Sequence, residues 1–249
     1  MNKKLNRLIC FALIVILSIP VVSIVFAGKP DRGPLEKIVF IHYKKGYGKP
    51  EETPGKPQKA DKEYYTLLVK GAKWKETPVN YVIDPDNTYG LSVEFIIGAI
   101  SASAEEWDDH TGTELFGSYT KGSSSWDVWE DVYSNRINEI FFGDYPRDGV
   151  IAVAIVWGYF GGPPSGREII EFDIMFDIDY TWGDATSYPK VMDLQNIATH
   201  EIGHGAGLGD LYKTETSDET MYGYSTEGEI KKRDLNPGDI AGIRFLYDE

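Results

Sequence analysis

Cysteine is almost absent from the sequence. The single thiol, Cys10, lies in an apolar run near the N-terminus, and no other cysteine follows in the remaining chain. The chain beyond that run therefore forms no internal disulfide bonds, and it cannot use a cysteine nucleophile or thiolate metal ligands. Its stability must come from a hydrophobic core, to which bound ions could add.

Positive charge is scarce in the main part of the chain. Residues 63–249 hold 13 Lys or Arg against 34 Asp or Glu, whereas residues 28–62 hold nine against five. A surface this acidic repels phosphate, which excludes nucleic acid as a partner. It is typical of a secreted protein kept soluble by self-repulsion, of one that binds cations, or of one adapted to salt.

A charge-free apolar run extends from Leu8 to Ala27, after Lys3, Lys4 and Arg7. This pattern is typical of a secretory signal peptide, here residues 1–27. An uncleaved N-terminal anchor is the alternative, because about 20 apolar residues also span a bilayer. In both cases we expect the rest of the chain outside the cytoplasm, either secreted or membrane-anchored and facing outward.

Residues 28–62 are rich in Pro, Gly and Lys, which favours a linker or propeptide, and the folded domain is expected over residues 63–249. Within it, alternating apolar residues predict strands over 79–84, 138–142, 149–158 and 168–177. Apolar residues at helical spacing predict helices over 93–109 and about 191–206, with a third that begins at Asn236 and Pro237. This order of elements indicates an α+β domain rather than alternating βαβ units.

The segment HEIGHGAGLGD carries the strongest chemical signal. His200 and His204 lie four residues apart on a predicted helix, hence on one face, where two imidazoles can reach one zinc ion. Between them, Glu201 can act as general base on a zinc-bound water. Gly207 ends the helix and permits a sharp turn that would return Asp210 as a third ligand. Three protein ligands and one open position are typical of a catalytic zinc site.

This segment resembles the metzincin signature HExxHxxGxxH, in the variant with aspartate as third ligand. Thr220, Met221 and Tyr222 resemble the Met-turn that lies under the metal in these enzymes. FDIDYTWGD resembles the acidic stretch before the zinc helix, and LNPGDIAGIRFLYDE resembles the C-terminal helix of matrixins. The resemblance covers residues 64–249 and implies a matrixin-like zincin fold, with a twisted mixed β-sheet, an active-site helix, a Met-turn and a C-terminal helix.

The function that this resemblance implies is that of a secreted zinc-dependent endopeptidase acting on protein or peptide substrates. One catalytic zinc is expected, with calcium left open as a second ion, and the protein is expected to be monomeric. Matrixin substrates lie extended and antiparallel to an edge strand, which here matches 149–158. The residues expected to bind substrate are Ala152, Val153, Ala154, Tyr222 and Tyr224.

Three departures from the matrixin pattern limit the resemblance. Residues 112–199 contain no histidine, so we expect the structural zinc of matrixins to be absent. No cysteine is available to block the catalytic zinc, as the propeptide cysteine does in matrixin zymogens. Gly223 stands where matrixins carry proline, so the wall of the S1′ pocket cannot be transferred from the family.

Two other functions remain as alternatives. One is a catalytically silent metal-binding surface module, against which the intact Glu201 argues. The other is a zinc amidase acting on cell-wall peptide. The turn at Gly207 and the Met-turn at Met221 favour an endopeptidase acting on extended peptides over the amidase.

The run Ile38–Tyr43 is the one strand-like stretch in residues 28–62, and it carries His42. Its Pro- and Gly-rich flanks favour a flexible spacer with an incidental histidine. The alternative hypothesis is that this basic segment docks on the acidic domain as an extra strand in the cleft. His42 would then cap the open zinc position and keep the enzyme latent.

Overall fold

The computed structural model describes residues 32–48, 64–124 and 133–248. The segment 1–27, expected to be a signal peptide or anchor, lies outside these ranges. Within them, none of the helices combines the length and the apolar character that crossing a membrane requires.

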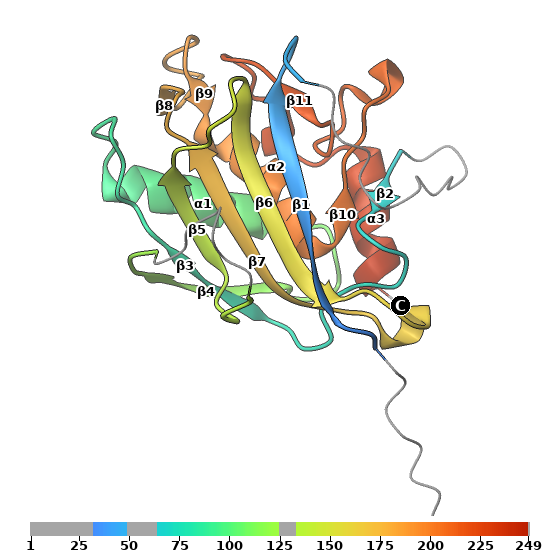
Figure 1. Cartoon of the computed structure of the whole chain (residues 1–249). Coiled ribbons are helices and arrows are strands. Elements are labelled where there is room, and N and C mark those ends of the chain that lie inside the picture. Colours follow the sequence, from blue (N-terminus) through green and yellow to red (C-terminus); the bar gives the residue numbers. More distant parts are fainter. Residues whose placement is uncertain (1–31, 49–63, 125–132, 249) are drawn as a thin grey trace, which may run out of the picture.

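A seven-stranded mixed sheet forms the centre of the molecule, with the strand order β11-β1-β6-β7-β5-β3-β4 (Figure 1). Strands β3, β4, β5 and β7 run parallel, whereas β6 is antiparallel to β7 and to β1. The strands are β1 (Leu35–Lys44), β3 (Val79–Ile83), β4 (Phe116–Lys121), β5 (Glu139–Gly143), β6 (Val150–Tyr159), β7 (Glu168–Asp177) and β11 (Tyr224–Ser225).

Short ladders and 3₁₀ turns flank this sheet. Two-stranded ladders join β2 (Thr66–Leu67) to β10 (Leu208–Gly209), and β8 (Trp182–Gly183) to β9 (Met192–Asp193). Short 3₁₀ turns form η1 (Pro164–Gly166), η2 (Thr214–Thr216) and η3 (Lys231–Arg233).

Three helices, α1 (Val93–Asp108), α2 (Leu194–Ala206) and α3 (Pro237–Tyr247), confirm the α+β class. Helices α1 and α2 pack against each other, and α2 also packs against β6 and β7 on one face of the sheet (Figure 1). Helix α2 begins later than the sequence predicts, because Met192 pairs in β9 and Asp193 caps the helix by accepting the N–H of Asn196.

The core between α1, α2 and the sheet fixes the position of α2. Trp107 is fully buried, and its indole N–H donates to the Thr199 carbonyl at 2.8 Å. Trp74 donates in the same way to the Gly205 carbonyl at 2.8 Å. A buried indole needs such a partner, and here both partners lie on α2. The helix that carries the metal-binding motif is thus held from two sides.

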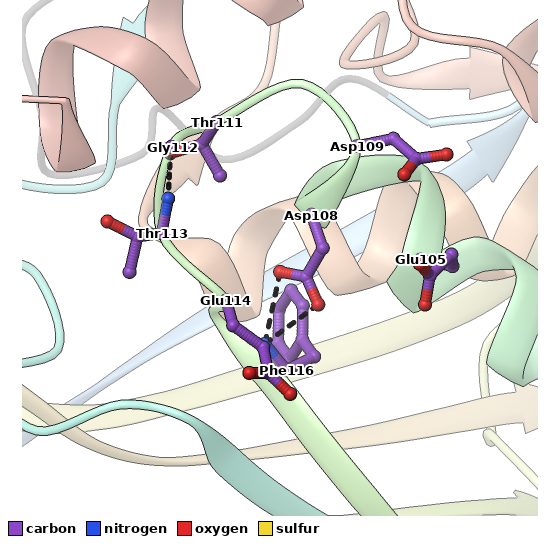
Figure 2. Close-up of a pocket in the computed structure, with 8 residues that line it drawn as sticks. All are labelled: Glu105, Asp108, Asp109, Thr111, Gly112, Thr113, Glu114 and Phe116. Atoms are coloured by element: carbon purple, nitrogen blue, oxygen red, sulfur yellow. Dashed lines mark hydrogen bonds between the residues drawn. The ribbon is translucent and has the colours of Figure 1, made fainter.

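The loop between α1 and β4 is held by Asp108 (Figure 2). The Asp108 carboxylate accepts the backbone N–H of Leu115 at 2.7 Å and that of Phe116 at 3.2 Å. Burial raises the pKa of this carboxyl to about 6. A pocket of about 280 Å³ lies beside it, lined mainly by acidic and small polar side chains. Sequence periodicity did not predict β4, whose residues after Phe116 are mostly exposed.

The run Ile38–Tyr43 lies within β1, which pairs with β6 on one side and β11 on the other. The flexible spacer favoured by composition is therefore wrong for residues 35–44. The docking alternative is the one that the structure supports, and its consequence for the cleft is described below.

Candidate metal centre and substrate cleft

Helix α2 presents both motif histidines to the same point. His200 and His204 are almost completely buried, and their rings meet edge to face with centroids 4.9 Å apart. Each imidazole donates from Nδ1 to a backbone carbonyl, His200 to Thr220 at 2.7 Å and His204 to Leu208 at 3.0 Å. Nε2 is therefore the atom that each imidazole presents to a metal.

Gly207 ends α2 in the left-handed region, with φ of 109°. The turn brings Asp210 back toward the helix, as the spacing predicts, so that its Oδ1 lies 3.2 Å from Nε2 of His200 and 3.5 Å from Nε2 of His204. The hydroxyl of Tyr212 donates to Asp210 Oδ2 at 2.7 Å and fixes the other carboxylate oxygen. Sequence reasoning did not identify Tyr212, because a tyrosine two residues after the motif has no distinctive spacing.

These three side chains fit a zinc ion. His200, His204 and Asp210 each offer one ligand atom, all within 4.8 Å of one another. Nε2 of His200 and Oδ1 of Asp210 are buried and have no hydrogen bond to any group in the described ranges. Burial lowers the pKa of His200 to about 4, which leaves a neutral imidazole at neutral pH. Although burial alone would raise it, the neighbouring imidazoles hold the pKa of Asp210 well below its usual range. Two nitrogens and one carboxylate are ligands that zinc prefers.

Glu201 points into the same space without joining the three ligands. It is fully buried, and burial raises the pKa of its carboxyl to about 8. Its Oε1 lies 2.8 Å from Nδ1 of His42, whereas Oε2 has no hydrogen-bond partner among the residues that the structure describes. A carboxylate with a raised pKa and one free oxygen suits a group that takes and returns a proton.

Met221 lies directly under α2, where the sequence places the Met-turn. Its sulfur is so close to Gly203 that a Cβ added there would lie 2.4 Å from it. The Met221 N–H donates to Asp239 Oδ1 at 3.0 Å, and the Thr220 N–H donates to Asp239 Oδ2 at 2.6 Å. Asp239, in the first turn of α3, thereby connects the C-terminal helix to the Met-turn and, through the Thr220 carbonyl, to His200.

Strand β1 fills the edge of β6 that the sequence assigns to substrate. Phe40, Ile41 and His42 pair with Ala154, Val153 and Ala152 in that order. All three expected substrate-binding residues on β6 are fully buried. β1 runs antiparallel to β6 and parallel to β11. It therefore has the direction expected of a bound substrate.

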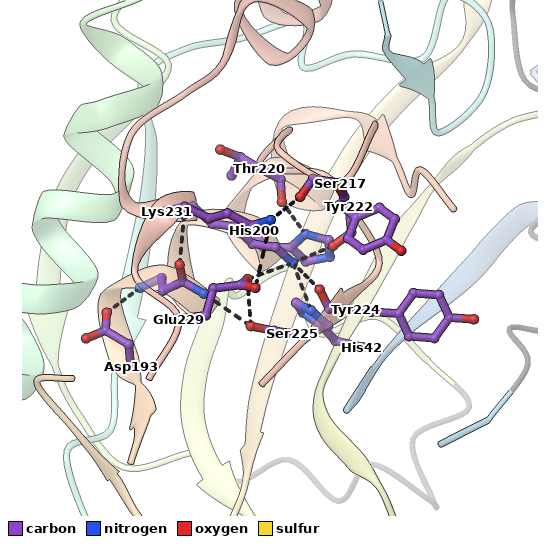
Figure 3. A network of polar contacts seen from close by, with 12 residues as sticks. His42, Asp193, His200, Ser217, Thr220, Tyr222, Tyr224, Ser225, Glu229 and Lys231 are labelled. Carbon is purple, nitrogen blue, oxygen red and sulfur yellow. Dashed lines mark hydrogen bonds and ion pairs between the residues drawn. The ribbon is translucent and has the colours of Figure 1, made fainter. Parts of the chain in front are cut away.

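The side chain of His42 enters the site beside His200, with ring centroids 4.0 Å apart (Figure 3). Both ring nitrogens already have partners, Nδ1 with Glu201 at 2.8 Å and Nε2 with Lys232 Nζ at 3.2 Å. An ammonium group can only donate, so Nε2 accepts and Nδ1 carries the proton that it donates to Glu201. His42 thus contacts the expected general base rather than closing the group formed by His200, His204 and Asp210.

The two remaining residues assigned to substrate follow Met221 of the Met-turn. Tyr222 and Tyr224 are half-buried, with ring centroids 5.7 Å apart, and both lie near His42 (Figure 3). Their carbonyl oxygens accept from the buried ammonium of Lys232. Sequence reasoning missed Lys232, since a lysine within the charged run KKRD is typical of an exposed surface.

A second group of carboxylates lies away from this centre. Asp144, Asp177 and Asp179 each offer an oxygen within 4.8 Å of the others. Asp177 is fully buried, and its Oδ2 makes no hydrogen bond within the described part of the chain. Burial raises the pKa of Asp177 to about 6.

Comparison with known proteins places these features in one family. A sequence profile of the family described as Matrixin matches residues 73–248. Among curated proteins, metalloendoproteinase 2-MMP of Arabidopsis thaliana is 29% identical over 191 residues, which is 74% of this chain and 45% of the relative. Metalloendoproteinase 1 of Glycine max is 37% identical over 109 residues, covering 41% and 31% of the two chains. Stromelysin-1 of Rattus norvegicus is 25% identical over 177 residues, covering 70% and 33%. The chain thus spans less than half the length of these relatives.

Proposed function

The chain belongs to the matrixin family, and we propose that it is a zinc-dependent endopeptidase that cuts protein or peptide substrates. The observation that carries this proposal is the convergence of His200, His204 and Asp210 on one point, with Glu201 beside it. The similarity to proteins named metalloendoproteinase supports the same activity.

His200, His204 and Asp210 would hold the zinc, each from a position that a hydrogen bond fixes. When bound, zinc polarises the scissile carbonyl and makes a water acidic enough to lose a proton near neutral pH. Glu201 takes that proton on its carboxylate and passes it to the leaving amine. The backbone of β6 pairs with the extended peptide and keeps the scissile bond at the ligands.

Residues 35–44 would keep the site closed until they are displaced. Strand β1 pairs with the edge of β6 that a substrate needs. The imidazole of His42 donates to Glu201, the expected general base. In this proposal residues 35–44 do not block the enzyme by capping the metal through His42. They block it because β1 competes with substrate for β6 and His42 contacts the general base Glu201. The uneven charge supports docking, because residues 28–62 are basic and the domain is acidic, although salt screens such attraction.

Secretion belongs to the same proposal. The basic N-terminus and the apolar run up to Ala27 support export, with a retained anchor as the alternative. The test is to express the whole chain and determine the N-terminus of the protein recovered from the medium. Recovery of the entire chain inside the cell, with the first 27 residues intact, would contradict export.

Calcium is proposed as a second ion, held by Asp144, Asp177 and Asp179. Three carboxylates this close repel one another unless a cation lies between them, and the buried Asp177 has one oxygen to offer. Added calcium should raise the melting temperature of the protein, and Asp177→Asn should remove that increase. An equal response of both proteins would contradict the site.

The catalytic proposal is tested by metal analysis together with a casein digestion assay. The wild-type protein should contain one zinc and cut casein once residues 28–62 have been trimmed away, and Glu201→Ala, trimmed in the same way, should keep the zinc while losing activity by about 10²–10⁴-fold. Glu215→Ala, a change at an exposed glutamate, is the matched control and should behave as wild type. Zinc without any digestion would indicate the silent binding module, and cleavage of cell-wall peptide alone would indicate the amidase.

A further inference from the structure

Lys232 lies against the buried side chain of His42, and the space that this side chain fills between His200, Glu201 and Lys232 is called the pocket below. Its side chain is fully buried, and its backbone N–H donates to Asn196 Oδ1 at 2.8 Å. Nζ donates to the carbonyls of Tyr222 and Tyr224, and its third partner is Nε2 of His42 at 3.2 Å. An ammonium group has three N–H donors, so all three are used in this arrangement.

Carboxylates balance the positive charge of Lys232 from a distance, because Glu229, Asp210 and Glu201 all favour its charged form. Glu229 supplies the one carboxylate oxygen within 4.0 Å of Nζ among the described residues, and that oxygen also accepts from the Ser225 hydroxyl at 2.9 Å. Burial lowers the pKa of Lys232 to about 8. Two of its donors are paired with fixed backbone carbonyls, whereas the third depends on the side chain that fills the pocket.

That side chain belongs to a strand with the geometry of a substrate. β1 pairs antiparallel with β6 and parallel with β11. A peptide that replaced β1 in the same register would place one of its own side chains where His42 lies, between His200 and Lys232. His42 therefore shows what the pocket accepts: a side chain whose tip is a hydrogen-bond acceptor.

We propose that Lys232 is a specificity-determining residue, and that this pocket selects substrate side chains ending in a hydrogen-bond acceptor, glutamate above all. This inference rests on the proposed endopeptidase function. The terminal oxygen of glutamate reaches about as far from Cβ as Nε2 of His42 does, and its charge complements the ammonium. Glutamine reaches equally far without the charge, and aspartate is one bond too short.

An aliphatic side chain would leave one N–H of the fully buried Lys232 side chain without a partner. Sites built to hydrogen-bond a substrate group discriminate strongly against analogues that lack it, because the buried polar group then stays unpaired. We expect glutamate to be preferred over leucine by about 10–100-fold in kcat/KM.

The first experiment uses the zinc-loaded chain from which residues 28–62 have been trimmed away, and it profiles cleavage of a mixed peptide library, with cut sites read by mass spectrometry. One fixed position next to the cut should be enriched in glutamate and then glutamine. Lys232→Met should lose that preference and favour leucine or methionine. Lys231→Met removes a neighbouring charge that lies partly exposed, and it should keep the wild-type preference.

A second measurement needs neither catalysis nor a change at Lys232. Hydrogen exchange of the β1 amides in the whole chain reports how well residue 42 fits the pocket. His42→Glu keeps an acceptor for Lys232 but loses the donor to Glu201, so it should protect residues 35–44 better than His42→Leu, which should exchange about tenfold faster or more than the wild type. Circular dichroism before both experiments confirms that each variant is folded.

The outcomes separate this inference from the function on which it rests. Cleavage without any enrichment of acceptor side chains overturns the specificity, as does slow exchange in His42→Leu equal to that in His42→Glu. A zinc-loaded protein that cuts no peptide even after residues 28–62 have been trimmed away contradicts the endopeptidase function, and the exchange experiment then still decides what the pocket accepts.

Discussion

The two sides of the cleft are built from the chain in opposite ways. On the α2 side, three candidate ligands lie within eleven residues, from His200 to Asp210, and nearby carbonyls orient both imidazoles. On the β1 side, Phe40 and His42 come from more than 150 residues earlier, and Phe40 stacks on His204 with centroids 3.8 Å apart. The local side is preorganised by its own backbone, whereas the distant side can leave without dismantling the first.

The largest expected effect comes from removing a metal ligand on α2. His204→Ala removes one ligand and also the hydrogen bond that orients it, so the protein should lose its zinc and about 10³-fold or more of its activity. Zinc content by elemental analysis and casein digestion measure both. His110→Ala changes a histidine outside the cleft and is the matched control. Full zinc content in His204→Ala would disprove the ligand assignment.

Removing β1 should raise the activity rather than lower it. A chain that begins at Glu63 lacks the blocking strand, and it should cut casein at least about tenfold faster than one that begins at Gly28, since even 1.4 kcal/mol of docking energy is worth that factor. The difference should shrink at high salt because the attraction between the two parts is screened. Equal rates at low salt would disprove the blocking role. His42→Ala in the longer chain would tell whether the imidazole or the strand blocks.

Phe40→Ala in the longer chain tests how firmly this side chain anchors β1. Loss of a buried ring that stacks on His204 should weaken docking of β1 by about 3 kcal/mol. Faster proteolysis of residues 35–44, with an unchanged melting temperature of the domain, is the expected result. Val39→Ala is the control, because Val39 lies on the other face of the strand and is 40% exposed. A similar response of both variants would show that Phe40 does not anchor the strand.

The smallest expected effect concerns the packing of α2 on the Met-turn. In Gly203→Ala the new methyl group would meet Met221 and Trp107, so the free energy of unfolding should fall by about 1–3 kcal/mol. Gly98→Ala in α1 is the control, since a Cβ there meets nothing within 4 Å and alanine favours a helix. Urea denaturation measures both. A Gly203→Ala protein as stable as wild type would show that the Met-turn shifts to admit the methyl group at little cost in free energy.

The same contrast explains what could be predicted from the sequence. The spacing of His200, Glu201 and His204 on one helix is a local property, so it predicted both the helix and the cluster. Asp210 followed because Gly207 permits the turn, and the structure has φ of 109° there. The main strands and helices followed from apolar periodicity, with boundaries shifted where Met192 and Asp193 entered a ladder and a helix cap.

Contacts between distant segments were not predictable in the same way. The register that places His42 opposite Ala152 depends on a sheet edge formed far along the chain, so composition favoured a spacer instead. Lys232 is buried only because the carbonyls of Tyr222 and Tyr224 surround it, and no local pattern reveals that. Tertiary context decided both positions against their local signals.

The bond between Asp239 and the Met-turn has a consequence for the order in which the protein can assemble. His200 is oriented by the Thr220 carbonyl, and Thr220 is held by Asp239 at the start of the last helix. During synthesis β1 leaves the ribosome before α3. The metal site can therefore reach its final geometry only after α3 has been made, and by then the strand that covers it has long been available. A nascent chain would pass through no stage in which a finished site stands uncovered.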